Sequence, residues 1–152
     1  MKPGDRLICC LVRPLASGAS FSDWPLHITI VPWFRINVVS SRLVNELSLN
    51  KFLPFKVTLG SESSLGVNKP VTLIKLPSAL TEIEAVIHNY LHDKGAWLVD
   101  ETTKEPHSFL PHITWQKGVK PAGGFRIAEI QLMQQTGGSK MVVAAWRVAD
   151  EN

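Results

Sequence analysis

The chain contains the segment PLHITI at residues 25–30 and a partial copy, PHITWQ, at residues 111–116. Apolar residues alternate with polar ones in the first segment, which is typical of a β-strand with one face in the core. Side chains two residues apart in a strand point the same way, so His27 and Thr29 share one face. The intervening Ile28 then points into the core. The segment therefore predicts a strand that presents an imidazole and a hydroxyl side by side.

The second copy predicts the same arrangement for His112 and Thr114. Random placement of the 5 histidines in the chain would give only about 0.3 His-x-Thr triplets. Two triplets with the same central Ile and similar apolar flanks are therefore a strong signal, whereas one alone would be weak.

Two imidazoles and two hydroxyls suit the cleavage of a phosphodiester by in-line displacement. A neutral imidazole can take a proton from the nucleophile while a protonated one gives a proton to the leaving oxygen. The pKa of histidine lies near neutrality, so both forms are accessible. Threonine hydroxyls can donate hydrogen bonds to the non-bridging oxygens. The scheme requires no metal ion and no cofactor.

The twin motifs, separated by about half the chain, resemble those of the 2H phosphoesterase superfamily. Within it they are most similar to the bacterial 2′-5′ RNA ligase-like (LigT-like), or RNA 2′,3′-cyclic phosphodiesterase, group. The resemblance covers the whole chain in layout, but only the two motifs are specific. It implies an α+β fold in which two pseudo-symmetric lobes of antiparallel sheet plus helix surround a central cleft. It also implies metal-independent hydrolysis of 2′,3′-cyclic phosphodiesters at RNA 3′ ends or on small nucleotides.

On the family pattern, His27 and His112 form the acid/base pair, and Thr29 and Thr114 bind the phosphate. By analogy, His112 activates the water and His27 protonates the departing ribose oxygen. After the first motif many members continue into Pro-Phe, whereas this chain has Val-Pro-Trp-Phe at residues 31–34.

Hydrophobic periodicity in the rest of the chain independently predicts an α+β fold of two related lobes within a single domain, residues 1–152. Strands are expected at 5–12, 26–31, 54–60, 70–76, 109–116, 125–135 and 140–148, and helices at 40–51 and 78–94. Pro32 is expected to end the first-motif strand, and Ser40 or Ser41 to cap the first helix. Residues 61–68 should form a turn, and residues 100–108 a charged loop.

Composition limits the setting and the partners. The chain is 45% hydrophobic, enough for a buried core, and its net charge of +3 favours anionic partners only mildly. The longest apolar run is too short to span a bilayer, so no membrane association is expected. Cys9 and Cys10 are adjacent, which makes a disulfide between them strained. We expect free thiols, a cytoplasmic protein and a monomer.

Four residues are candidates for substrate binding: Trp33, Phe34, Gln116 and Arg13. Trp33 and Phe34 follow Pro32 and could line the mouth of the cleft, and Gln116 shares the face of Thr114. Arg13 follows a predicted strand, as do three other basic residues that could attract an anion: Arg35, Lys117 and Lys120. Trp115 shares the face of Ile113 and is expected in the core.

Other functions remain open at this stage. The same site could act as a 2′-5′ RNA ligase, and the fold could serve a non-catalytic RNA- or nucleotide-binding protein. A zinc-dependent hydrolase could use His88 and His92, which lie one helical turn apart near Glu84, although a solvated helix face is favoured. His107, before the second motif, could contact substrate. Finally, both His-Ile-Thr segments could be structural.

Overall fold

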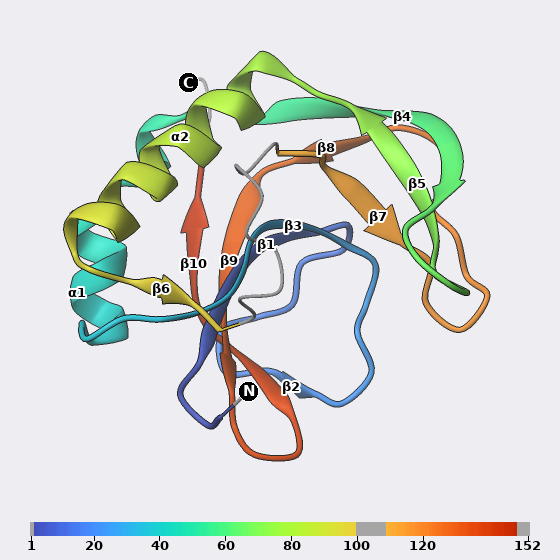
Figure 1. The fold of residues 1–152 in the computed structure, drawn as a ribbon. Coiled ribbons are helices and arrows are strands. Elements are labelled where there is room, and N and C mark those ends of the chain that lie inside the picture. The colour runs from blue at the N-terminus through green and yellow to red at the C-terminus, as the bar shows by residue number, and fades with distance from the viewer. Residues whose placement is uncertain (1, 100–108, 149–152) are drawn as a thin grey trace.

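The computed structural model describes residues 2–99 and 109–148, and the strands in these ranges form one antiparallel sheet (Figure 1). The strands are β1 (Arg6–Leu11), β2 (Ser20–Phe21), β3 (His27–Arg35), β4 (Phe55–Ser64), β5 (Pro70–Lys75), β6 (Trp97–Leu98), β7 (His112–Thr114), β8 (Phe125–Ile127), β9 (Glu129–Gln135) and β10 (Lys140–Arg147). The helices are α1 (Ser40–Glu46) and α2 (Ser78–Asp93), with a short 3-10 turn at Leu49–Lys51. No helix of the described ranges is long and apolar enough to cross a membrane.

The two halves of the sheet meet where β3 pairs with β7. The strand order is β2-β10-β9-β1-β3-β7-β5-β4-β8, and β6 pairs with the far end of β3. One half thus combines strands from both ends of the chain, with β6 added at β3, and the other half holds β7, β5, β4 and β8. The predicted α+β architecture of antiparallel sheet and helices is confirmed, with the two predicted lobes continuous through this junction.

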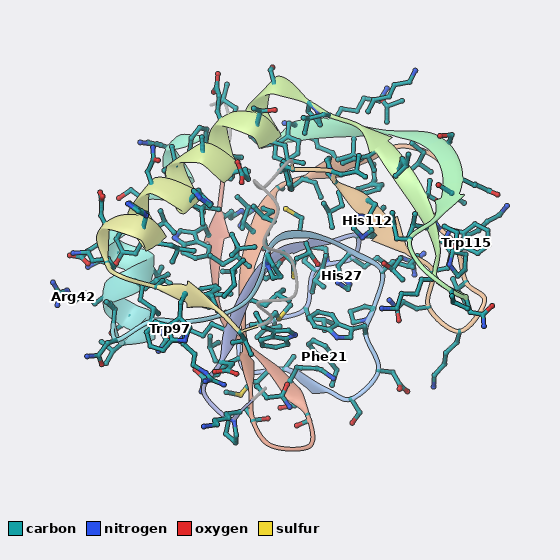
Figure 2. All side chains as sticks on the ribbon, viewed as in Figure 1. Phe21, His27, Arg42, Trp97, His112 and Trp115 are labelled. Atoms are coloured by element: carbon teal, nitrogen blue, oxygen red, sulfur yellow. The ribbon has the colours of Figure 1, made fainter. Side chains whose placement is uncertain are left out.

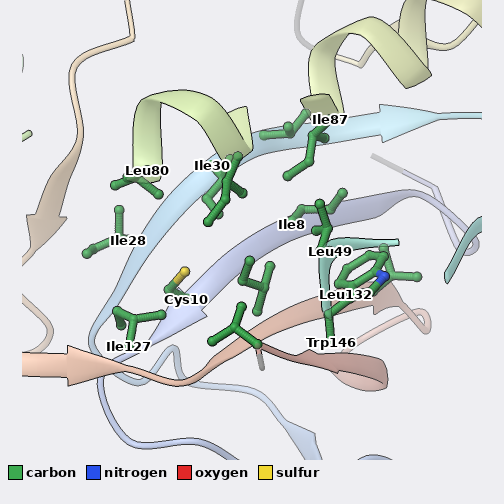
Figure 3. Close-up of a cluster of buried hydrophobic side chains, with 14 of the residues drawn as sticks. Ile8, Cys10, Ile28, Ile30, Leu49, Leu80, Ile87, Ile127, Leu132 and Trp146 are labelled. Carbon is green, nitrogen blue, oxygen red and sulfur yellow. The ribbon is translucent and has the colours of Figure 1, made fainter. Parts of the chain in front are cut away.

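The main core lies between the sheet and the two helices. Ile28 and Ile30 of β3 point into it, as their alternation with polar residues predicts, and Figure 3 shows them in one cluster with Ile8 and Cys10 of β1. The apolar stripe of α2 packs on the same cluster and is buried along its length: Leu80, Ile83, Ile87 and Leu91. Burying such side chains stabilises the fold by about 1.5–3 kcal/mol each. The predicted helix boundaries at 78–94 agree with α2 to within one residue.

A smaller apolar cluster covers part of the opposite face of the sheet. It contains Leu7, Cys9 and Leu11 of β1, whereas Ile8 and Cys10 point into the main core. β1 is therefore buried on both faces. Both cysteines are free, as predicted, and burial raises the pKa of the Cys10 thiol to about 12.

The strand of the first motif does not end at Pro32, contrary to the sequence prediction. β3 continues to Arg35, because a β-bulge interrupts its pairing with β1 at the proline: Arg6 pairs with Phe34, and Ile8 with Val31. A bulge removes the need for the N–H that proline lacks.

Several other boundaries differ from the predictions. Val39 precedes the first helix turn without a side-chain cap, and α1 ends at Glu46, so neither Ser40 nor Ser41 is the N-cap. β4 runs on to Ser64, where a turn was predicted. β7 is only three residues long, and β2 lies between the strands predicted at 5–12 and 26–31, where no strand was predicted. The predicted loop at 100–108 lies outside the described residues.

A buried ion pair ties the start of β1 to the end of β3. Asp5 is almost fully buried, and its carboxylate accepts hydrogen bonds from Arg35 Nε (2.6 Å) and from the backbone N–H of Lys2 (2.7 Å). The Arg35 guanidinium lowers the pKa of Asp5, outweighing the opposing effect of burial. Arg35, which we had considered for attracting an anionic substrate, is therefore engaged in a structural pair.

We predict that Asp5→Asn lowers the free energy of unfolding at pH 7 by about 1–3 kcal/mol, since it removes a charged, hydrogen-bonded acceptor. A carboxyl group whose pKa is lowered by folding stabilises the folded state at pH values above its ordinary pKa. This contribution is lost as the pH falls through the pKa that the group has in the folded protein. The difference in free energy of unfolding between wild type and Asp5→Asn should therefore shrink below about pH 4. Urea unfolding at pH 7 and pH 3 measures both effects.

Glu62→Gln is the matched control, because Glu62 pairs with Lys120 at 2.9 Å on an exposed surface. This substitution should lower the free energy of unfolding by no more than about 0.5 kcal/mol. Equal destabilisation by the two substitutions would contradict a structural role specific to the buried pair.

Candidate active site

The pairing of β3 with β7 brings the two His-x-Thr motifs together. Ile28 pairs with Ile113, and both side chains are fully buried. The histidines and threonines on either side of these isoleucines consequently point to the other face of the sheet. Figure 2 shows His27 and His112 close to each other at this junction.

Continuing the antiparallel register places His27 opposite Thr114, and Thr29 opposite His112. Directly opposed residues have Cβ atoms about 4.5–5.5 Å apart, whereas diagonal neighbours such as the two histidines are about 7–8 Å apart. The four side chains selected from the sequence therefore form one cluster.

Both imidazoles are oriented by the same local hydrogen bond. Nδ1 of His27 donates to the carbonyl of Pro25 (2.8 Å), and Nδ1 of His112 donates to the carbonyl of Leu110 (2.9 Å). A carbonyl oxygen only accepts, so the proton resides on Nδ1 in each neutral ring. The Nε2 atoms are then left to accept or donate a proton. Sequence periodicity could not reveal this bond, because it depends on the backbone before each strand.

His27 has an aromatic neighbour that the sequence analysis missed. The indole of Trp24 lies against the imidazole, with ring centroids 4.2 Å apart and planes inclined by 31°. Burial lowers the pKa of His27; the bond to Pro25 opposes this effect, and the charge of His112 adds to it. Trp24 lies in the loop before β3, where alternation gives no indication of which way a side chain points.

The hydroxyls of Thr29 and Thr114 are available to a ligand. Within residues 2–99 and 109–148, neither makes a hydrogen bond to another protein group through its hydroxyl. Thr29 and His112 line a cavity of about 260 Å³ whose other walls are mainly apolar, including Pro32, Leu65 and Phe109.

A larger cavity of about 470 Å³ is lined by residues that precede β3 and residues that follow β7. Trp24, Pro25 and Gln116 line it, together with Asp23 and Lys117, which form an ion pair at 2.7 Å. Gln116 is therefore close to the motif cluster. The backbone reverses direction immediately after Gln116, in a turn in which Gln116 pairs with Val119.

The other candidate substrate-binding residues occupy different environments. Phe34 is fully buried in the main core, so its predicted place at the cleft mouth is wrong: β3 continues past Pro32, and Phe34 points into the same core as Ile28 and Ile30. Trp33 is half-buried beside Trp24, with centroids 6.3 Å apart. Arg13 is exposed and borders a separate cavity of about 390 Å³ that Pro25 also lines.

Trp115 lies on the face of Ile113, as strand alternation predicts, but it is only half-buried. Its Nε1–H donates to the hydroxyl of Thr72 (2.9 Å), and Lys120 lies 5.5 Å from the ring centroid. β7 ends at Thr114, so Trp115 lies at the margin of the sheet and not in the core cluster.

The alternative zinc site receives no support from the arrangement of side chains. His88 and His92 are exposed on α2, and the described part of the chain has no group of three or more His, Cys, Asp or Glu that could hold a metal. His107 lies outside the described residues.

No protein-family profile and no curated protein sequence matches the chain. Several solved structures resemble it in fold. A protein described as a phosphoesterase has a TM-score of 0.61 and 15% identity, covering 98% of this chain and 100% of that one. Escherichia coli LigT, solved with NADP+, has a TM-score of 0.60 and 16% identity, with 99% and 100% coverage. A protein from Thermus thermophilus has a TM-score of 0.57 and 16% identity, with 97% and 100% coverage.

LigT has also been solved with 3′-AMP and with phosphate. At such low identity, these likenesses establish the fold. Over essentially its whole length, the chain therefore has the fold of LigT-like phosphoesterases.

Proposed function

We propose that this chain is a 2H phosphoesterase that hydrolyses 2′,3′-cyclic phosphodiesters at RNA ends or on nucleotides, with paired histidines and without a metal ion. One observation carries the proposal: two His-x-Thr pairs lie side by side on one face of the β3–β7 junction. A structural role for both motifs would not account for threonine hydroxyls without protein partners in the described ranges. The LigT-like fold supports the same proposal.

In the proposed reaction, the phosphorus lies between the two Nε2 atoms. One neutral imidazole takes a proton from water as the water oxygen attacks, and the other, protonated imidazole donates to the departing ribose oxygen. The hydroxyls of Thr29 and Thr114 donate to the non-bridging oxygens, whose negative charge increases during the reaction. The product is a ribose phosphomonoester.

The nucleoside has room in the cavity lined by Trp24 and Gln116. Gln116 can hydrogen-bond a ribose hydroxyl or a base there, and Trp33 stands behind Trp24. Arg13, on the rim beyond Pro25, can attract the anionic substrate. The complexes of LigT with 3′-AMP and phosphate show that a protein of this fold binds nucleotides, which supports this placement. Since one chain supplies both motifs, we propose that the protein acts as a monomer, in the cytoplasm.

We predict that His27→Ala and His112→Ala each reduce kcat for 2′,3′-cyclic AMP by at least about 100-fold, since each removes one proton-transfer group. Hydrolysis should be followed by separating substrate from product in the presence of excess chelator. His92→Ala is the matched control, because this histidine is exposed on α2, and it should retain the wild-type rate. Wild-type activity in either motif variant would refute paired acid/base catalysis.

Thr29→Val and Thr114→Val should each cost about 1–4 kcal/mol of transition-state stabilisation, because they remove a donor to phosphate while preserving side-chain shape. Thr29→Ser and Thr114→Ser should restore most of the rate. The comparison of kcat/KM among these variants checks the role of the hydroxyl. If valine and serine variants behaved alike, hydrogen bonding to phosphate would not be the function of these residues.

Gln116→Ala should raise KM for a cyclic nucleotide several-fold with little change in kcat, since it removes a contact away from the reacting atoms. Steady-state kinetics separate the two constants. Gln135→Ala serves as control, because that residue lies at the far end of β9. A fall in kcat at constant KM would instead place Gln116 at the phosphoryl group.

A further inference from the structure

The two motifs share their strand geometry, their opposing threonine and their Nδ1 hydrogen bond, but they differ in one respect. His27 is stacked against the Trp24 indole, whereas among the described residues His112 has no aromatic ring against it. His112 instead faces the cavity that it shares with Thr29.

We propose that Trp24 is a positioning residue that assigns His27 to proton abstraction from water and His112 to proton donation to the leaving group. The inference rests on the proposed function and specifies how its two histidines divide the work. It reverses the roles that the family analogy implies.

Trp24 restricts the orientation of the His27 ring. The bond from Nδ1 to Pro25 fixes one edge of the imidazole, and the indole covers one of its faces. Trp24 is itself held by Phe21, whose ring meets it edge-on at 5.0 Å. Phe21 and His27 lie on the side of the sheet away from α2 (Figure 2). Nε2 of His27 is thereby held in one direction, as a base poised over a reacting water requires.

The groups around His27 also disfavour a positive charge on it. Leu11 of β1 lies opposite it and is buried, and β7 contributes neutral Thr114 and the second titratable imidazole, His112. An indole face attracts cations. Here, however, the Lys140 ammonium of β10 already lies 5.9 Å from the centroid of the Trp24 ring. Its positive charge disfavours a second cation, a protonated His27, against the same ring.

The carboxylate of Asp23, which precedes Trp24 in the chain, does not offset these effects. Asp23 is paired with Lys117, so its charge is already compensated. Desolvation against Trp24 and Leu11 accordingly lowers the pKa of His27. A neutral imidazole with a free Nε2 is the form that a general base needs before each turnover.

The complete step is balanced in atoms and protons. The water oxygen forms a bond to phosphorus while its proton moves to Nε2 of His27. The bond from phosphorus to one ribose oxygen breaks, and that oxygen receives the proton from Nε2 of His112. Proton exchange with solvent then returns His27 to its neutral form and His112 to its protonated form.

The first experiment measures the pKa of both imidazoles by NMR, and the pH dependence of kcat/KM, in wild type, Trp24→Ala, Trp24→Phe and Trp97→Ala. Trp97 is half-exposed on β6 and serves as the matched control. Trp24→Ala should raise the pKa of His27 and move the acidic limb of the profile to higher pH. At pH 6, its kcat/KM should therefore fall about three- to tenfold more than at pH 8. Trp24→Phe, which preserves stacking, should restore most of the wild-type behaviour.

The second experiment uses a diester whose leaving group needs no proton, bis(p-nitrophenyl) phosphate. Here the general acid is dispensable while the base is still required. His112→Ala should lose at most about tenfold in rate relative to wild type, and His27→Ala at least about 100-fold. The opposite pattern would overturn the assignment, as would an unchanged or lowered pKa of His27 in Trp24→Ala. Loss of folding in that variant leaves Trp24→Phe and the two histidine variants to decide. A wild-type protein that hydrolyses neither 2′,3′-cyclic AMP nor bis(p-nitrophenyl) phosphate would refute the proposed function itself.

Discussion

The pairing of β3 with β7 is the interaction on which the rest of the structure depends. It joins the two halves of the sheet, and Ile28 and Ile113 at the junction are fully buried in one core with α2. The side chains of a strand alternate between its faces, so a one-residue slip would move a histidine into this core and an isoleucine out of it. Burial of the two isoleucines therefore fixes the positions of both His-x-Thr pairs.

The site combines this shared framework with a local asymmetry. Each imidazole is held by a carbonyl two residues before it, so both motifs carry their own orienting bond. Only the first has a stacked indole within the described chain, contributed by the loop before β3. Near-symmetric halves that differ in one neighbour provide a simple way to make two identical side chains chemically unequal, which acid/base catalysis requires.

The sequence predicted the features that depend on local periodicity. Alternation identified which side chains of the His-Ile-Thr segments face the core, and the boundaries of α2 were predicted to within one residue. It did not predict that β3 continues past Pro32, because this depends on the bulged pairing with β1, and it therefore missed the burial of Phe34. Nor did it predict the stacking of Trp24 on His27, since periodicity says nothing of side-chain direction in a loop. The prediction that the two motifs lie next to each other came from the family resemblance and from the unusual repetition of the motif. Neither strand alone predicted it.

The central claim is that both motifs bind a single phosphoryl group, and a titration of the protein with inorganic phosphate tests it most directly. Imidazole nitrogen signals of His27 and His112 should be followed by NMR at constant pH, with His92 as internal reference. If both motifs bind one phosphoryl group, the Nε2 signals of both motif histidines shift with one common dissociation constant, while the His92 signals stay unchanged. Shifts confined to one of the two, or two separate dissociation constants, would contradict it.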